Sequence, residues 1–237
     1  MISDLGGSAA ASATGQVRER NEDSAYAGRW LYAVADGLGG HPGGDIASAA
    51  AIRALSRYDE QVSGNQALET TLRRAFAAAA EAVAKAAADD PGLAAMATTL
   101  TALLRSGDHV VLGHIGDSRA YRRRDGRLAQ LSEDHVTEVP PFGTVMTRCI
   151  GGGADDAPDM TAYDARPGDR WLLCSDGLYG VVSDSAILQA LAAGTPAAAA
   201  ARLAELAEAA GSPDNVTVIV IDEGTVTGPA VLGAAST

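Results

Sequence analysis

Lysine is nearly missing from this chain of 237 residues, because all but one of its 18 basic residues, Lys85, are arginine. No G-x-x-x-x-G-K-[ST] segment occurs, and no strand lysine is available, which excludes a P-loop and a kinase site. The two cysteines, Cys149 and Cys174, form no C-x-x-C pair, so zinc-ribbon and thioredoxin chemistry are excluded. Neither begins a C-x5-R loop, which excludes a thiolate-based tyrosine phosphatase. So few thiols favour a reducing compartment.

Long hydrophobic runs and an excess of positive charge are also missing. No apolar run reaches the roughly 18 residues that a membrane-spanning helix needs, and no basic region precedes an apolar one at the N-terminus. The 30 acidic residues exceed the 18 basic ones, which gives a net charge of −12. Nucleic acid and anionic membranes would repel such a chain. We therefore expect a cytoplasmic monomer that binds neither.

The composition, 47% apolar and 20% charged, is that of a globular protein. We expect flexible segments over residues 1–14 and 224–237, and one domain over 15–223. Within it, helical patterns follow a first apolar strand, a strand-rich block occupies the middle, and two helices and a strand close the chain. This order is not the strict alternation of parallel α/β folds, so we predict an α+β sandwich.

Acidic residues stand at the ends of several expected strands. Asp36 and Asp176 each follow an apolar strand and precede a glycine, Asp117 follows another strand, Asp214 precedes the last one, and Glu22 lies ahead of the first. One Asp-Gly pair is commonly a turn, but several at strand ends can bring carboxylates to one place. Clustered carboxylates repel one another unless a cation neutralises them. Oxygen ligands suit Mg²⁺ or Mn²⁺.

Six segments carry a resemblance to a known family. In order, they are VRERNEDS, ADGLGGH, TTLT, GDSRAY, SDGL and DNVT, which begin at residues 17, 35, 98, 116, 175 and 214. Together they resemble the PP2C-type metal-dependent protein phosphatases (the PPM family) in their bacterial form, over residues 15–222. The resemblance implies a four-layer α-β-β-α sandwich with two central antiparallel sheets.

The resemblance also implies an activity and a set of site residues. The activity is hydrolysis of phosphoserine and phosphothreonine in proteins, reversing Ser/Thr kinase signalling, by a hydroxide that bridges two Mg²⁺ or Mn²⁺ ions and attacks phosphorus in line. The expected partners are phosphorylated proteins and a bacterial Ser/Thr kinase. Carried onto this chain, the roles are a bridging ligand, Asp36; a carbonyl ligand, Gly37; ligands of one ion, Asp176 and Asp214; a ligand of the other, Glu22; a ligand of a weak third ion, Asp117; a phosphate-binding residue, Arg18; and a general acid, His41.

The chain departs from the family in two places that bear on function. The flap expected between Asp134-His135 and Thr147-Arg148 is reduced to residues 136–146. Some members have an acid four residues after the second Asp-Gly aspartate, where this chain has Gly180. We therefore expect altered substrate selectivity and weaker binding of a third ion.

Two other interpretations remain open at this point. The chain could be an inactive module that binds phosphoproteins, although such a module should have lost acids such as Asp36 or Asp176. Residues 31–58 could instead form a nucleotide-binding strand, loop and helix. The glycines after Asp36 do not spell G-x-G-x-x-G, which argues against that interpretation.

Overall fold

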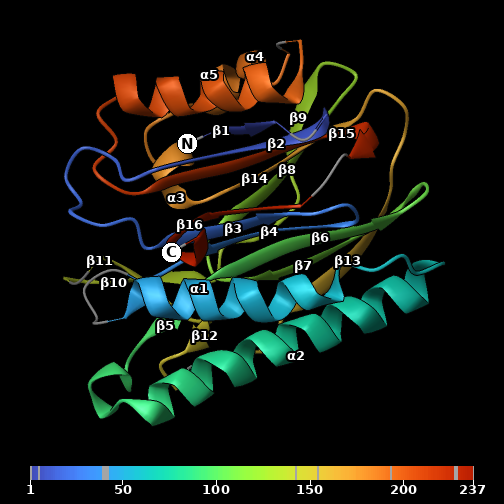
Figure 1. Cartoon of the computed structure of the whole chain (residues 1–237). Helices are drawn as coiled ribbons and strands as arrows, with labels where there is room; N and C mark the ends of the chain where they lie inside the picture. Colours follow the sequence, from blue (N-terminus) through green and yellow to red (C-terminus); the bar gives the residue numbers. More distant parts are fainter. Residues whose placement is uncertain are drawn as a thin grey trace.

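The computed structural model describes residues 2–4, 6–38, 43–141, 143–153, 155–192, 194–226 and 229–236. Two antiparallel six-stranded sheets face each other, and helices cover both outer surfaces (Figure 1). The predicted four-layer α-β-β-α arrangement is therefore present. None of the helices in these ranges is long and apolar enough to cross a membrane.

The first sheet contains strands from the N-terminal part, the middle and the C-terminal part of the chain. Its order is β1 (Ile2–Asp4), β2 (Gly6–Ala13), β15 (Val216–Val226), β14 (Arg170–Cys174), β8 (Arg119–Arg124) and β9 (Arg127–Gln130). Its outer face is covered by α4 (Asp184–Ala190) and α5 (Pro196–Ala209), and α3 (Asp176–Tyr179) follows β14 directly.

The second sheet carries the long helices. Its order is β13 (Asp159–Asp164), β7 (His109–Ile115), β6 (Leu100–Ser106), β4 (Leu31–Asp36), β3 (Asp23–Ala27) and β16 (Ala230–Gly233). The helices α1 (Gly44–Leu55) and α2 (Asn65–Asp89) lie across its outer face. A Cβ at Gly113 of β7 would lie 2.6 Å from the Phe76 ring, so glycine there lets α2 approach the sheet.

Strand β4 is a continuous apolar run because both of its faces are buried. Leu31, Ala33 and Ala35 belong to the cluster under α1 and α2, whereas Tyr32 and Val34 belong to the core between the sheets. A strand buried on both faces needs no polar alternation. The same holds for β14 on the other sheet. Packing on both faces holds the two strands in place. Strand β4 ends at Asp36, and β14 is followed after one residue by Asp176.

Both ends of the chain differ from the flexible segments that we predicted. Within residues 1–14, β2 pairs with β15, and Ala9, Ala10 and Ala11 are buried. Near the C-terminus, β16 pairs with β3, and Leu232 is buried. The prediction missed β2 because its small residues have low strand propensity, whereas here they allow α5 to lie close against the sheet.

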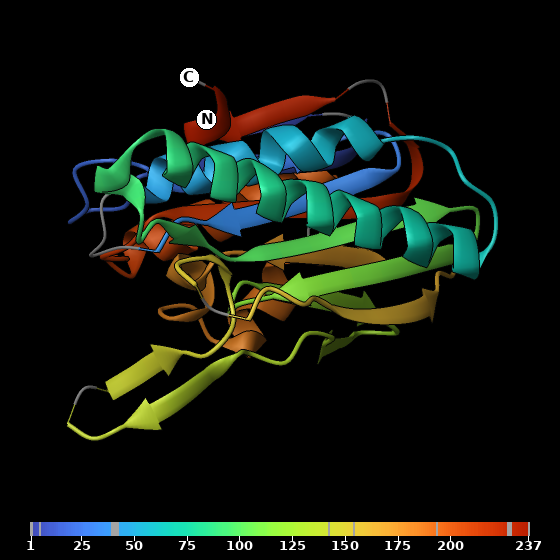
Figure 2. The ribbon, with the colours of Figure 1, turned by 90° about the horizontal axis from the view of Figure 1, so that it is seen from below.

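The segment that we predicted to be a shortened flap, residues 136–146, is a hairpin that projects from the body of the protein (Figure 2). It consists of β10 (Val136–Val139) and β11 (Gly143–Met146), which pair antiparallel. After the hairpin, β12 (Ile150–Gly151) forms a second small pair with β5 (Ala97–Thr98). The short helical turns are η1 (Ser56–Tyr58), η2 (Pro91–Leu93) and η3 (Ala234–Ser236).

Candidate metal and phosphate site

Carboxylates from both sheets meet where β4 and β14 end. Burial, followed by repulsion from Asp23 and Asp176, raises the pKa of Asp36 well above its ordinary value. Burial and the nearby Asp214 likewise raise the pKa of Asp176. Burial and Asp176 raise the pKa of Asp117 to about 7. Asp36, Asp117 and Asp176 therefore lie close enough to repel one another.

Asp23 belongs to the same cluster, although the sequence assigned it no role. Its side chain is fully buried, and burial raises its pKa to about 7 despite a hydrogen bond that Ser175 Oγ donates to Oδ2 at 2.8 Å. In the sequence, its position directly after Glu22 in the segment NEDS was the one indication that it lies near the site. Asp23 therefore adds negative charge behind the predicted ligands.

The oxygen atoms of this cluster fit a hard cation. The buried Oδ1 atoms of Asp176 and Asp23 have no hydrogen-bond partner among the described residues. A buried carboxylate without a partner is costly, and a cation removes that cost. Oxygen-only donors suit Mg²⁺ or Mn²⁺. Within the described ranges, no three His, Cys, Asp or Glu side chains form a ready-made metal site, so an ion bound here needs backbone oxygen or water as well.

The backbone around Asp36 is held in place by the Thr-Thr segment. Thr98 Oγ1 donates to the Asp36 carbonyl at 2.8 Å, and the Thr99 N–H donates to the same oxygen at 2.9 Å. The Asp36 N–H in turn donates to Thr99 Oγ1 at 2.9 Å. At Gly37, a Cβ would overlap the Gly44 carbonyl, so only glycine allows α1 to begin this close to the site.

Asn215 joins the segments that carry Asp214 and Glu22. It is buried, and its Oδ1 accepts the Glu22 N–H at 2.8 Å. Its Nδ2 donates to the carbonyls of Thr14 and Arg20 at 2.7 and 2.9 Å. The sequence placed Asn215 in a motif but gave it no role; in the structure it fixes the position of Glu22.

Arg18 lies among the predicted metal ligands. Its Nη2 donates to Asp214 Oδ2 at 2.7 Å, and its Nη1 lies 4.0 Å from Glu22 Oε2. The hydrogen bond to Asp214 raises the pKa of Arg18. The side chain is 37% exposed, so the guanidinium borders solvent as well as the acidic cluster. The structure thus brings Arg18 to the predicted site.

Tyr179 and Arg119 support the loop of Asp117. The Tyr179 hydroxyl donates to the Asp117 carbonyl at 2.9 Å, and the Arg119 guanidinium lies 3.6 Å from the centre of the Tyr179 ring. Arg119 also forms a forked ion pair with Asp134, with a shortest contact of 2.6 Å. We assigned no role to Tyr179 from the sequence, and its only signal is an aromatic residue directly after Asp-Gly-Leu.

Of the four histidines, the structure describes His109, His114 and His135, and the last two make structural contacts near the site. His114 is buried, and burial followed by the neighbouring His135 lowers its pKa to about 4. His135 Nδ1 accepts the Gly116 N–H at 3.0 Å, so it holds the loop that precedes Asp117. The predicted general acid, His41, lies outside the described residues.

Comparisons with known proteins agree with the fold. Residues 15–211 match the family model described as Protein phosphatase 2C. The chain belongs to this family of metal-dependent protein phosphatases. The family and the fold class predicted from the sequence are therefore confirmed.

Two curated relatives match most of this chain, but they differ in their own length. The chain is 43% identical over 229 residues to the serine/threonine protein phosphatase PstP of Mycobacterium tuberculosis. The matched region covers 90% of this chain but only 44% of PstP. It is 29% identical to the serine/threonine phosphatase stp of Listeria monocytogenes, over 88% of this chain and 92% of that protein. The chain thus spans less than half the length of PstP.

Solved structures show the same fold. The crystal structure of M. tuberculosis PstP superposes with a TM-score of 0.84 at 43% identity and covers 91% of this chain and 97% of that one. The PstP catalytic domain in complex with two manganese ions gives a TM-score of 0.83 at 43% identity, over 91% and 96% of the two chains.

Proposed function

We propose that this chain is a metal-dependent serine/threonine protein phosphatase that removes phosphate from phosphoserine and phosphothreonine in proteins. The observation that carries the proposal is the cluster of buried carboxylates, with raised pKa values, at the ends of β4 and β14. Two Mg²⁺ or Mn²⁺ ions held there would supply an activated water at neutral pH and would neutralise phosphate charge. The relatives named as phosphatases support the same reaction.

The residues proposed to hold the ions are those that the family resemblance implies. Asp36, which Asp23 and Asp176 repel, would be the ligand that both ions share. Asp176 and Asp214 would hold one ion, and Glu22 with the carbonyl of Gly37 would hold the other. Burial raises the pKa of Glu22, although the nearby Arg18 partly opposes this shift. A cation bound beside Glu22 would favour its ionised form. Asp117 has fewer neighbours for a third ion because residue 180 is glycine.

Arg18 binds and orients the substrate phosphate. Its guanidinium offers a fork of donors that matches two phosphate oxygens. It is partly exposed and already borders the acidic cluster, so a small movement away from Asp214 brings it to a phosphate above the site. His41 is proposed to protonate the leaving oxygen of serine or threonine.

The substrates are phosphorylated proteins, and a bacterial Ser/Thr kinase is the proposed source of the phosphate. The phosphatase domain is proposed to span residues 15–223 together with the terminal strands. Its monomeric state and its place in the cytoplasm stay predictions from the sequence.

Phosphopeptide hydrolysis tests the proposal. Peptides with phosphothreonine, phosphoserine or phosphotyrosine are incubated with the protein in Mn²⁺, in Mg²⁺ and in EDTA. We expect phosphate release from the first two peptides with metal and none in EDTA. Folded protein that releases no phosphate with either metal would refute the phosphatase and favour a phosphoprotein-binding module.

A further inference from the structure

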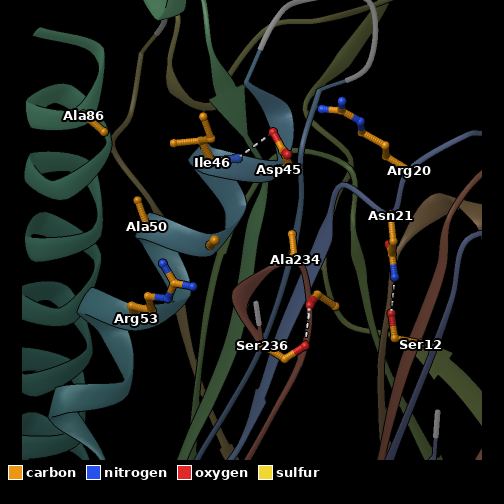
Figure 3. Close-up of a pocket in the computed structure, with 12 residues that line it drawn as sticks. Ser12, Arg20, Asn21, Asp45, Ile46, Ala50, Arg53, Ala86, Ala234 and Ser236 are labelled. Carbon is orange, nitrogen blue, oxygen red and sulfur yellow. Dashed lines mark hydrogen bonds between the residues drawn. The ribbon is translucent and has the colours of Figure 1, made fainter. Parts of the chain in front are cut away.

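A groove of about 890 Å³ opens between α1, η3 and the chain segment that leads into β3 (Figure 3). We call it the α1 groove and define it by Arg20, Asn21, Asp45, Ile46, Arg53 and Ser236. Its volume lies in the range of pockets that hold small molecules or short peptide segments. None of the roles proposed above uses it.

One end of the groove adjoins the metal and phosphate site. Asn21 directly precedes Glu22, and the Asp45 carboxylate contributes to raising the pKa of Glu22. Gly44, next to Asp45, touches the same ligand: a Cβ on Gly44 would lie 3.2 Å from Glu22 Cδ. A peptide whose phosphate reaches the metal site can therefore continue into the groove.

The groove is locally positive in a strongly negative protein. Arg20 and Arg53 are both exposed, and neither forms an ion pair within 4.0 Å in the part of the chain that the structure describes. Figure 3 shows them at opposite ends of the groove. Among the described residues of the lining, Asp45 is the single carboxylate. Two guanidiniums against one carboxylate contrast with the net charge of −12 of the whole chain.

The far end of the groove has a fixed cation over a small apolar surface. Arg53 Nη2 donates to the Ala235 carbonyl of η3 at 3.2 Å, which orients its guanidinium and leaves its other donors for a ligand. Ile46 is 41% exposed, and the neighbouring Ala50 is small, so the surface between the two arginines is open to an extended chain.

We propose that the α1 groove docks the part of the phosphoprotein substrate that flanks the phosphorylated residue, and that Arg20 and Arg53 select acidic side chains there. This inference rests on the phosphatase function proposed above. Asp45 and Arg53 are eight positions apart, or about 12 Å along the helix at the usual rise per residue. An extended peptide covers that length in about four residues. Arg53 therefore reads an acidic residue about four to six positions from the phosphorylated one.

Steady-state kinetics with paired peptides test this docking site. Each peptide carries one phosphothreonine and either Asp or Asn at the positions four to six residues before it, or four to six residues after it. With wild-type protein we expect the KM of one Asp peptide to be about fivefold lower than that of its Asn partner, the size of a good partly exposed ion pair. The kcat should be the same for both.

Charge reversal at the far end is the decisive variant. Arg53→Glu should remove or invert the preference for Asp, and Arg53→Ala should remove it. Arg57→Glu is the matched control, because it makes the same change of charge one turn further along but lies outside the groove. An Arg53→Glu protein that keeps the wild-type preference, or an equal loss in Arg57→Glu, would overturn the proposal, as would a wild type that shows no preference on either side.

Hydrolysis of p-nitrophenyl phosphate separates this inference from the proposed function. This small substrate cannot reach Arg53, so Arg53→Glu should hydrolyse it at the wild-type rate. Wild-type protein that fails to hydrolyse both this compound and every peptide refutes the phosphatase function itself. Wild-type turnover of the small compound with no effect of Arg53 on peptides refutes only the docking site. Arg20 lies at the near end of the groove, so peptides with Asp or Asn one to three residues from the phosphothreonine test it separately. Arg20→Glu should remove a preference for Asp there and leave the preference at positions four to six unchanged.

Discussion

Replacing Asp117 by asparagine should stabilise the metal-free protein at neutral and alkaline pH. Burial and the neighbouring Asp176 raise the pKa of Asp117 from 3.8 to about 7. Because the folded-state pKa is the higher one, the folded protein favours the protonated form, and stability is lost as the pH rises from about 4 through 7. A shift of about three pKa units corresponds to about 4 kcal/mol, which is an upper limit for the gain.

Urea unfolding in EDTA at pH 4 and pH 8 measures this effect. At pH 8, Asp117→Asn should unfold at higher urea than wild type, with a gain in unfolding free energy of up to about 4 kcal/mol. At pH 4 the two proteins should differ little. The control is Asp125→Asn, an exposed turn residue with a positive φ of 51° that asparagine also tolerates. A gain at pH 8 no larger than that of the control would refute the reasoning.

Three further substitutions test the site. Asp176→Ala should abolish phosphate release and leave the far-ultraviolet circular dichroism spectrum unchanged, because the loss relieves repulsion within the cluster; wild-type turnover would contradict its role as a ligand. Arg18→Ala should raise the KM for phosphopeptides about tenfold or more with a smaller change in kcat, as expected for a charged hydrogen bond to phosphate; an unchanged KM would remove Arg18 from the phosphate site. Tyr179→Phe, which deletes the hydroxyl that donates to the Asp117 carbonyl, should cost about 1 kcal/mol of stability and speed amide exchange in the loop of Asp117, and equal exchange in both proteins would argue against this support.

The parts of the fold that the sequence predicted are those with local signals. The apolar runs of β4 and β14 identify strands buried on both faces, and the acids after them identify the site. The segment GGSAAASA gives no such signal, since small residues neither alternate nor branch, yet β2 lies inside the first sheet beside β15. Its strand character comes from tertiary packing under α5, which no local pattern reports.

In the candidate site too, some residues could be predicted from the sequence and others could not. The acids and Arg18 were predicted because their residue types carry the chemistry. The contacts of Asn215 with Thr14, Arg20 and Glu22 join residues about 200 positions apart in the chain. The hydrogen bond from Tyr179 to Asp117 likewise depends on how the two sheets face each other. Such partners can be identified only once the fold is known.

Titration of the metal-free protein with Mn²⁺ in a calorimeter tests most directly that the buried carboxylates form a metal centre. Measured at pH 6.5 in two buffers of different ionisation enthalpy, it yields both the number of ions bound and the protons released. Two ions per chain should bind, and protons should be released, because carboxyls with raised pKa values, among them Asp36 and Asp117, must ionise to accept a cation. Binding of fewer than two ions, or binding without proton release, would contradict the account.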